Sequence, residues 1–211
     1  MSDYLELTKI KSILINDIQR SIKTDVKPLL KEENIDGEIG GYFAVPLLAL
    51  TLIEYLGRLR YGCTKEGDGS KYAQLWIKKY MARSNIRYKK IGGLIYDMFR
   101  HGTVHKREPK QYLFTKNSGM GWIIVKGERQ LEHLTLPNGR TLLFSLDQMI
   151  IDLENAIEYF YSDLESSQII RTKFSNSYKK LRKPQWVPWL NRRKRYLKKD
   201  LQIIKGELKS W

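Results

Sequence analysis

The feature that most constrains the fold is a stripe of apolar residues that recur every three or four positions between residues 146 and 164. This spacing places them on one face of an α-helix, and Ser145 with Gln148 forms a capping-box pattern at its start. We expect the helix to end near Ser166. A stripe this regular has to pack against other helices, in the same chain or across a dimer axis. The residues of the stripe are Leu146, Ile150, Leu153, Ile157, Phe160 and Leu164.

Apolar periodicity predicts further helices at residues 3–23, 42–60 and about 88–101. The second of these is apolar nearly all round, so we expect it to be the central buried helix. Gly92 and Gly93 weaken the third helix by roughly 1 kcal/mol each against alanine. Their presence indicates a close approach of another helix, from this chain or from a second subunit. The chain is therefore expected to be mainly α-helical, as a bundle.

The pattern changes to short β-type runs between residues 111 and 144. Asn138-Gly139 between apolar runs is a strong hairpin signal, so we expect a small antiparallel sheet inserted between the helices. His133 falls in a stretch of alternating polarity and is expected to lie on a strand surface without a role. The predicted strands are Tyr112–Phe114, Trp122–Val125, Leu134–Leu136 and Thr141–Phe144.

The net charge of +15 is concentrated at the C-terminus. Residues 171–211 hold 14 Lys or Arg against two acidic residues, a net +12, which leaves +3 for residues 1–170. A segment of this kind attracts RNA, DNA or anionic lipid by displacing counterions, in a salt-sensitive way. We therefore divide the chain into a helical domain at 1–170 and a basic helical extension at 171–211.

The extension interleaves basic clusters with tryptophans, a pattern typical of single-stranded nucleic acid binding because cations follow phosphates and indole rings stack on bases. Two alternatives stay open. The segment could be a linker whose tryptophans dock on the core, or the amphipathic stripe at 197–211 could contact a partner or lie on an anionic membrane. The predicted nucleic-acid contacts here are Lys180, Arg182, Lys183, Trp186, Trp189, Arg192, Arg193 and Arg195.

Several classes of protein are excluded or disfavoured by what the sequence lacks. Cys63 is the only cysteine, so no intramolecular disulfide forms, and no Cys/His group has zinc-ligand spacing. No P-loop, dinucleotide fingerprint or Ser-His-Asp arrangement is visible. The N-terminus has no secretory signal pattern, and the longest apolar run is too short to span a bilayer. We expect a cytoplasmic protein that uses no metal or cofactor.

The strongest chemical signal is the grouping of Arg100, His101 and His105 just past an apolar helical run. An imidazole transfers protons near neutral pH, and a guanidinium binds phosphate through two parallel hydrogen bonds. The group therefore suggests chemistry on a phosphodiester. On a straight helix Arg100 and His105 would lie about 140° apart. Gly102, followed by two β-branched residues, is expected to end or loosen the helix and let the two side chains converge.

Arg100, the polar His101, three further residues and then His105, near the end of an apolar helix, resemble the R-[N/D/H]-x(3)-H signature of HEPN domains. Members of that superfamily are α-helical bundles, commonly dimeric, and many are metal-independent ribonucleases. The resemblance implies that Arg100 and His105 are catalytic, that His101 supports them, and that a second subunit completes the site. It also implies a role in toxin-antitoxin systems or defence, with an antitoxin or neighbouring protein as a possible partner.

If the site cleaves RNA, Lys106, Arg107 and Lys110 are placed to steer a single strand towards it. The rival interpretation is that Arg100 caps the helix C-terminus while the histidines form local hydrogen bonds. The protein would then be a non-enzymatic helical module, monomeric or dimeric, that binds nucleic acid or a partner protein through its basic C-terminus.

Overall fold

A computed structural model describes residues 5–31, 42–62, 67–106, 108–115, 118–127 and 130–183, apart from the side chains at 105, 106, 114, 115 and 118. The chain divides into two compact units, Met1–Tyr178 and Lys179–Trp211. Helix α7 (Gln168–Leu181) carries residues of both units, and the predicted boundary at residue 170 falls inside it. The predicted helix at 197–211 lies outside the described residues.

The first unit begins with a helical run that is continuous from residue 7 to residue 26 and so extends beyond the predicted end at 23. It comprises α1 (Leu7–Ser12), the π-helical segments η1 (Ile13–Gln19) and η2 (Ile22–Val26), and the 3₁₀ turn η3 (Pro28–Leu30). Five of its buried residues recur at every fourth position. An α-helix would rotate such a stripe by about 40° per repeat, whereas π-helical turns hold more residues and keep it facing the core. The stripe is Ile10, Leu14, Ile18, Ile22 and Val26.

Helix α2 (Ala44–Tyr61) is the buried helix that the sequence predicts at 42–60. Helix α3 (Gly69–Lys79) lies directly against it, because a Cβ atom at Gly57 would sit 2.5 Å from the carbonyl oxygen of Tyr72. The 3₁₀ turn η4 (Met81–Arg83) then leads from α3 towards the next helix.

Helix α4 (Arg87–Ile95) packs on α3 in the same way. A Cβ atom at Gly92 would lie 2.6 Å from Cγ2 of Ile77, and one at Gly93 would lie 2.8 Å from Oε1 of Gln74. The close approach predicted for these two glycines is therefore confirmed, and the neighbouring helix belongs to the same chain.

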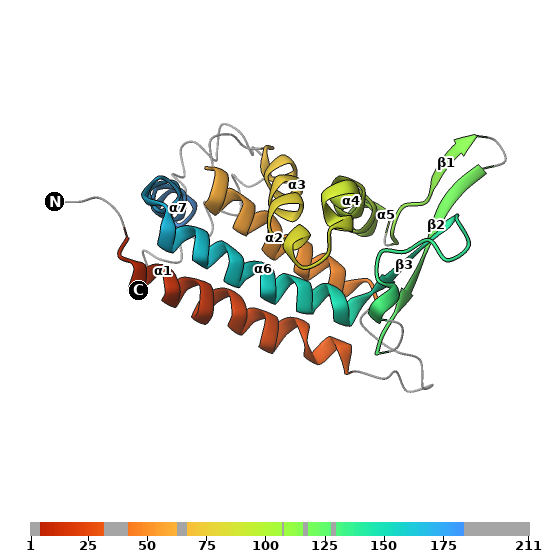
Figure 1. The fold of residues 1–211 in the computed structure, drawn as a ribbon, viewed down its shortest axis with the longest axis horizontal. Coiled ribbons are helices and arrows are strands. Elements are labelled where there is room, and N and C mark those ends of the chain that lie inside the picture. Colours follow the sequence, from red (N-terminus) through yellow and green to blue (C-terminus); the bar gives the residue numbers. More distant parts are fainter. Residues whose placement is uncertain are drawn as a thin grey trace, which may run out of the picture. The chain divides into compact units, whose positions relative to one another are not determined.

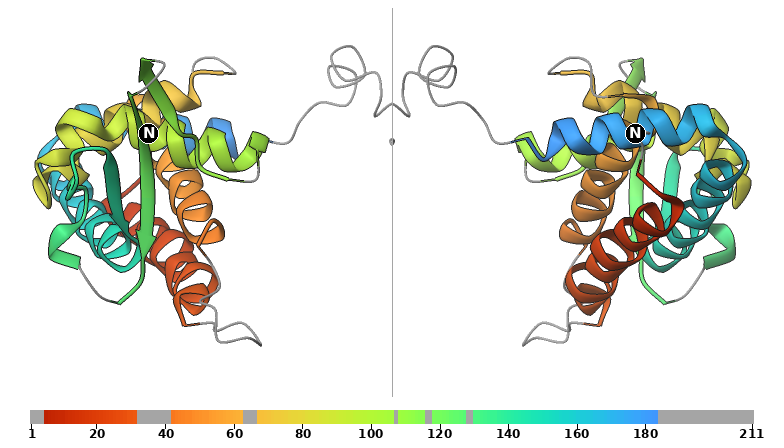
Figure 2. Two further views of the ribbon diagram at one scale, coloured as in Figure 1. Left: turned by 90° about the vertical axis from the view of Figure 1, so that its right-hand side faces the viewer. Right: turned by 90° about the vertical axis from the view of Figure 1, so that its left-hand side faces the viewer.

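Helix α6 (Leu146–Ser166) confirms the predicted helix and lies alongside the N-terminal run (Figure 1). The hydroxyl of Ser145 caps it by accepting a hydrogen bond from the Gln148 N–H at 3.3 Å. The second half of the predicted capping box does not form, because the Ser145 N–H donates to Nδ1 of His133 and not to the Gln148 side chain. Viewed end-on in Figure 2, the N-terminal run, α2 and α6 form the helical layer beside the strands.

The sheet consists of β1 (Tyr112–Thr115), β2 (Ser118–Val125) and β3 (Thr141–Ser145), in the order β1-β2-β3. Strands β1 and β2 pair antiparallel, but β2 and β3 pair parallel, so the predicted purely antiparallel sheet is wrong. The predicted strand at Leu134–Leu136 is also wrong. The chain from β2 returns through the 3₁₀ turn η6 (Gln130–Glu132) before it enters β3 in the same direction as β2.

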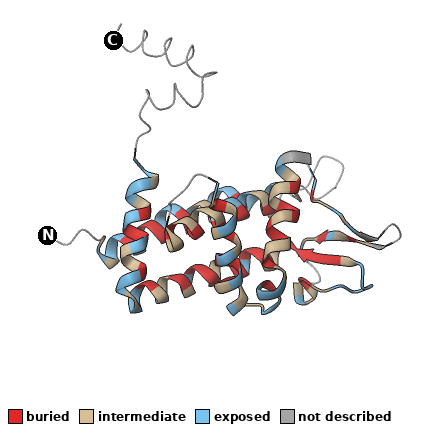
Figure 3. Ribbon diagram, turned by 90° about the horizontal axis from the view of Figure 1, so that it is seen from above, coloured by how far each residue is buried: buried red, intermediate tan, exposed pale blue. Residues whose placement is uncertain are grey.

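His133 is buried, with 1% of its surface exposed, which corrects its predicted place on a strand surface. Its Nδ1 accepts a hydrogen bond from the Ser145 N–H at 2.9 Å, so the ring proton is on Nε2, which lies 2.8 Å from the hydroxyl of Tyr88. Burial, together with the charge of Arg87, lowers the pKa of His133 to about 3. The imidazole is thus a neutral core group that joins the start of α6 to α4. Figure 3 colours the buried residues of the described chain red.

Candidate functional site

The predicted motif lies on a helix that continues through it. Helix α4 passes into the π-helical segment η5 (Tyr96–His101), and α5 (Gly102–Lys106) follows directly. The helix therefore does not end at Gly102, whose φ of −58° is helical. Glycine is required there for a different reason, since a Cβ atom would lie 2.5 Å from the backbone nitrogen of Lys110. The chain that leaves α5 folds back against this position.

This backbone corrects the expected way of bringing the motif together. The widened turn ends at His101, and the residues that follow, 102–106, are α-helical. Positions 101 and 105 are thus about 40° apart around the helix axis, while positions 100 and 105 remain separated by more than a right angle. The structure does not describe the side chain of His105.

Arg100 faces a carboxylate on another helix. Its Nη2 lies 4.0 Å from Oε2 of Glu54, on α2, and its side chain is 23% exposed. Glu54 accepts closer hydrogen bonds from the Tyr96 hydroxyl at 2.8 Å and from Nη2 of Arg58 at 2.9 Å. Gly69, the first residue of α3, packs against the same carboxylate. Two guanidinium groups therefore share one carboxylate, and Arg58 holds the direct hydrogen bond.

The protonation of Glu54 follows from these contacts. Burial acts to raise the pKa of Glu54, but hydrogen bonds from Tyr96 and Arg58 and the nearby guanidinium charges outweigh it, so the pKa is lowered. The carboxylate is therefore ionised at neutral pH. Nε of Arg100 is buried and has no hydrogen-bond partner among the described residues. The base of this side chain is held in the protein while part of its guanidinium reaches the surface.

His101 is oriented by a second carboxylate, Asp97, one turn earlier on the same helix. Nδ1 of His101 donates to Oδ1 of Asp97 at 2.9 Å, and Nζ of Lys110 donates to the same oxygen at 2.8 Å. The hydroxyl of Tyr112, on β1, donates to the other carboxylate oxygen. The His101 ring also meets the Tyr96 ring edge to face, with 5.2 Å between centroids. Asp97 thereby ties the motif helix to the sheet.

These contacts also set the ionisation of Asp97 and Tyr112. Burial acts to raise the pKa of Asp97, but the hydrogen bonds from Lys110, Tyr112 and His101 dominate and lower it to about 2. Burial and the bond to Asp97 raise the pKa of Tyr112. At neutral pH the cluster thus contains a carboxylate anion and a neutral phenol.

The basic residues predicted to contact nucleic acid differ in their environment in the structure. Lys110 forms an ion pair with Asp97 at 2.8 Å, and its side chain is 28% exposed. Lys180, Arg182 and Lys183 are exposed at the end of α7. The remaining predicted contacts lie outside the described side chains. These are Lys106, Arg107, Trp186, Trp189, Arg192, Arg193 and Arg195.

Sequence reasoning missed the residues that orient the motif. Two of them could have been found, since Tyr96 precedes Arg100 and Asp97 precedes His101 by four positions, the spacing of helical neighbours. Glu54 had no such signal, because it comes from α2. Tyr112 was assigned only to a strand.

Within the described ranges, no group of three His, Cys, Asp or Glu side chains is arranged to hold a metal ion. No helix in these ranges combines the length and apolar character needed to cross a bilayer. Comparison of the chain with protein-family models, with curated proteins and with solved structures found no match.

Proposed function

We propose that this protein is a metal-independent endoribonuclease that cleaves single-stranded RNA at a site containing Arg100, His101 and His105. The observation that carries the proposal is that Arg100 and His101 are adjacent on one helical turn and face two different carboxylates, Glu54 and Asp97. Carboxylate partners restrict the orientation of an imidazole or a guanidinium, as a reaction on a phosphodiester requires. The resemblance of the motif to the HEPN signature supports the same chemistry.

Arg100 has the electrostatic properties of a phosphate-binding group. Its 4.0 Å separation from Glu54 is longer than a hydrogen bond, and Arg58 already satisfies that carboxylate at 2.9 Å. Its positive charge is therefore available to stabilise the charge that builds on a pentacoordinate phosphate.

The reaction needs proton transfer at two oxygens. A general base, which we assign to His105, takes the proton of the ribose 2′-hydroxyl as that oxygen bonds to phosphorus. The bond from phosphorus to the 5′ oxygen of the next nucleotide breaks, and that oxygen receives a proton from a general acid. The products are a 2′,3′-cyclic phosphate and a free 5′-hydroxyl. In this proposal a second subunit supplies the matching motif, and the protein acts in the cytoplasm, in toxin-antitoxin or defence biology.

The proposal is tested with purified protein, a labelled single-stranded RNA and excess EDTA. We expect cleavage of RNA but not of DNA of the same sequence. His105→Ala and Arg100→Ala should each reduce the rate by at least about 100-fold, the scale of general acid and base catalysis. Lys89→Ala, an exposed cation on α4, is the matched control and should cleave normally. Wild-type rates in His105→Ala, with both proteins folded, would remove the assignment.

The second candidate is a non-catalytic helical module, monomeric or dimeric, that binds nucleic acid or a partner protein through its basic C-terminus. The limited exposure of the Arg100 side chain, 23%, and its position opposite Glu54 favour this alternative, since both are expected of a structural residue. Salt-sensitive RNA binding with no cleavage in the same assay would identify this module.

A further inference from the structure

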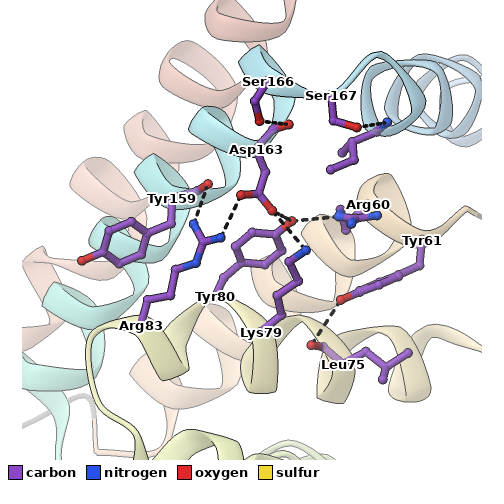
Figure 4. A network of polar contacts seen from close by, with 11 residues as sticks. Arg60, Tyr61, Leu75, Lys79, Tyr80, Arg83, Tyr159, Asp163, Ser166 and Ser167 are labelled. Carbon is purple, nitrogen blue, oxygen red and sulfur yellow. Dashed lines mark hydrogen bonds and ion pairs between the residues drawn. The ribbon is translucent and has the colours of Figure 1, made fainter.

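Positively charged side chains from α3 and η4 surround one carboxylate on α6, that of Asp163. Asp163 of α6 accepts from Nη2 of Arg83 at 2.8 Å and lies 3.1 Å from Nζ of Lys79 (Figure 4). The hydroxyl of Tyr80 donates to the same carboxylate at 3.0 Å. Because this group draws on α3, η4 and α6, we call it the Asp163 cluster.

A third cation, Arg60 at the end of α2, joins the Asp163 cluster indirectly. Its Nε donates to the Tyr80 hydroxyl at 2.8 Å, and that hydroxyl is the one bound to Asp163. Among the described residues, Arg60 forms no ion pair of its own. The cluster thus holds three cations, Arg60, Lys79 and Arg83, around one carboxylate.

The surplus charge faces outward. The side chains of Lys79 and Arg83 are 37% and 40% exposed, whereas that of Asp163 is 17% exposed. Burial acts to raise the pKa of Asp163, but hydrogen bonds from Arg83, Lys79 and Tyr80 lower it, so the carboxylate stays ionised at neutral pH. The solvent therefore meets two partly exposed cations above a deeper anion.

Aromatic rings flank these cations. The guanidinium carbon of Arg60 lies 5.0 Å from the ring centroid of Tyr61, and that of Arg83 lies 5.5 Å from the ring centroid of Tyr159. Tyr61 stacks in turn on Tyr72, with 6.1 Å between centroids and 15° between planes. Figure 4 places Tyr159 and Tyr61 on opposite sides of the cluster with the cations between them. Tyr61, Tyr72 and Tyr159 are all half-buried and so keep part of their surface exposed.

We propose that the Asp163 cluster is a binding surface for single-stranded nucleic acid, made of residues other than those of the Arg100 motif and of the basic C-terminus. Lys79 and Arg83 contact successive phosphates, while Tyr159 stacks on a base with the ring face that Arg83 leaves open. Alternation of cations and aromatic faces is the arrangement that binds a single strand without reading its sequence. The proposal rests on the proposed function only in taking RNA as the natural ligand, because the surface binds the strand whether or not it is cleaved.

The test measures binding of the full chain to a fluorescent oligothymidylate, which lacks the 2′-hydroxyl and so is not cleaved by the proposed route. Anisotropy titrations at several salt concentrations give the slope of log K against log salt. Lys79→Gln with Arg83→Gln removes two phosphate contacts and should weaken binding and reduce the slope by about 1.4. Lys9→Gln with Lys23→Gln removes the same charge from exposed positions of the N-terminal run and should leave the slope unchanged.

Asp163→Asn should change the binding affinity in the opposite direction to the double variant. It therefore keeps the test decisive if Lys79→Gln with Arg83→Gln does not fold. Removing the carboxylate frees Lys79 and Arg83, so the variant should bind the oligonucleotide more tightly than the wild type. Equal slopes for the two double variants, no gain in the folded Asp163→Asn protein, or binding only to phosphatidylserine vesicles would each overturn the proposal. If the oligonucleotide binds as predicted but RNA is not cleaved, the binding-surface proposal stands and the ribonuclease proposal is contradicted.

Discussion

Nδ1 of His101 donates to Oδ1 of Asp97 across 2.9 Å, and both residues lie within one turn of the motif helix. The same oxygen accepts from Nζ of Lys110, which lies beyond the turn after α5. The position of the imidazole is therefore coupled to the path of residues 108–112. A change at Asp97 should alter both the stability of this region and the geometry of the candidate site.

Asp97→Asn should lower the free energy of unfolding at pH 7 by about 1 kcal/mol, since the carboxylate is partly exposed and solvent screens its ion pairs. The pKa of Asp97 is lowered to about 2, so its contribution is present above the ordinary carboxyl pKa and is lost as the pH falls towards 2. Urea unfolding of wild type and variant at pH 7 and pH 3 measures this difference.

The stability difference should be smaller at pH 3 than at pH 7. Glu6→Gln, which removes an exposed carboxylate from the start of α1, is the control and should unfold like the wild type. A pH-independent difference between Asp97→Asn and the wild type would show that the ionised carboxylate does not stabilise the fold.

His133 should make the protein sensitive to mild acid. Its pKa in the folded protein is about 3, below the ordinary value of 6.5, so the unfolded chain binds a proton that the folded chain does not. The stability conferred by the neutral imidazole is complete above about pH 6.5 and falls by several kcal/mol as the pH drops towards 3.

His133→Leu isolates this contribution. At pH 7 it should cost about 2 kcal/mol, because the Ser145 N–H and the Tyr88 hydroxyl lose their buried partner. Between pH 6.5 and pH 4 its stability should fall less than that of the wild type. Parallel curves for the two proteins in chemical denaturation would contradict a neutral histidine in the core.

Gly57→Ala should be among the most damaging single substitutions in α2. The added Cβ would lie 2.5 Å from the carbonyl oxygen of Tyr72, and a backbone atom of a packed helix has little room to move. Overpacking of this kind costs typically 1–3 kcal/mol, more than the roughly 1 kcal/mol that alanine adds through helix propensity. Thermal unfolding should show a lower melting temperature. Gly121→Ala, where no atom lies within 4 Å of the new Cβ, is the control and should melt near the wild type.

The helices could be predicted because their signals are local. The stripe and cap of α6 occupy neighbouring positions in the sequence, and α2 is apolar over almost its whole length. The π-helical form of η5 was not predictable in this way, since a change from i+4 to i+5 hydrogen bonds leaves no mark on composition.

The errors lie where partners are distant in sequence. The parallel pairing of β2 with β3 depends on a crossover connection. The alternating polarity around residue 133 does not reveal that Tyr88, on α4, supplies a buried hydrogen-bond partner for His133. The same holds for the candidate site. Arg100 and His101 could be singled out from their types and spacing, whereas Glu54 and the three-cation arrangement around Asp163 required the folded chain.

The most decisive measurement uses a DNA strand that contains a single ribonucleotide, incubated with the protein in EDTA. The ribonuclease proposal predicts one cut, on the 3′ side of the ribonucleotide, leaving a 2′,3′-cyclic phosphate that mass spectrometry identifies, and no such product with His105→Ala. An uncut strand, under conditions in which the folded protein binds it, would contradict the proposal.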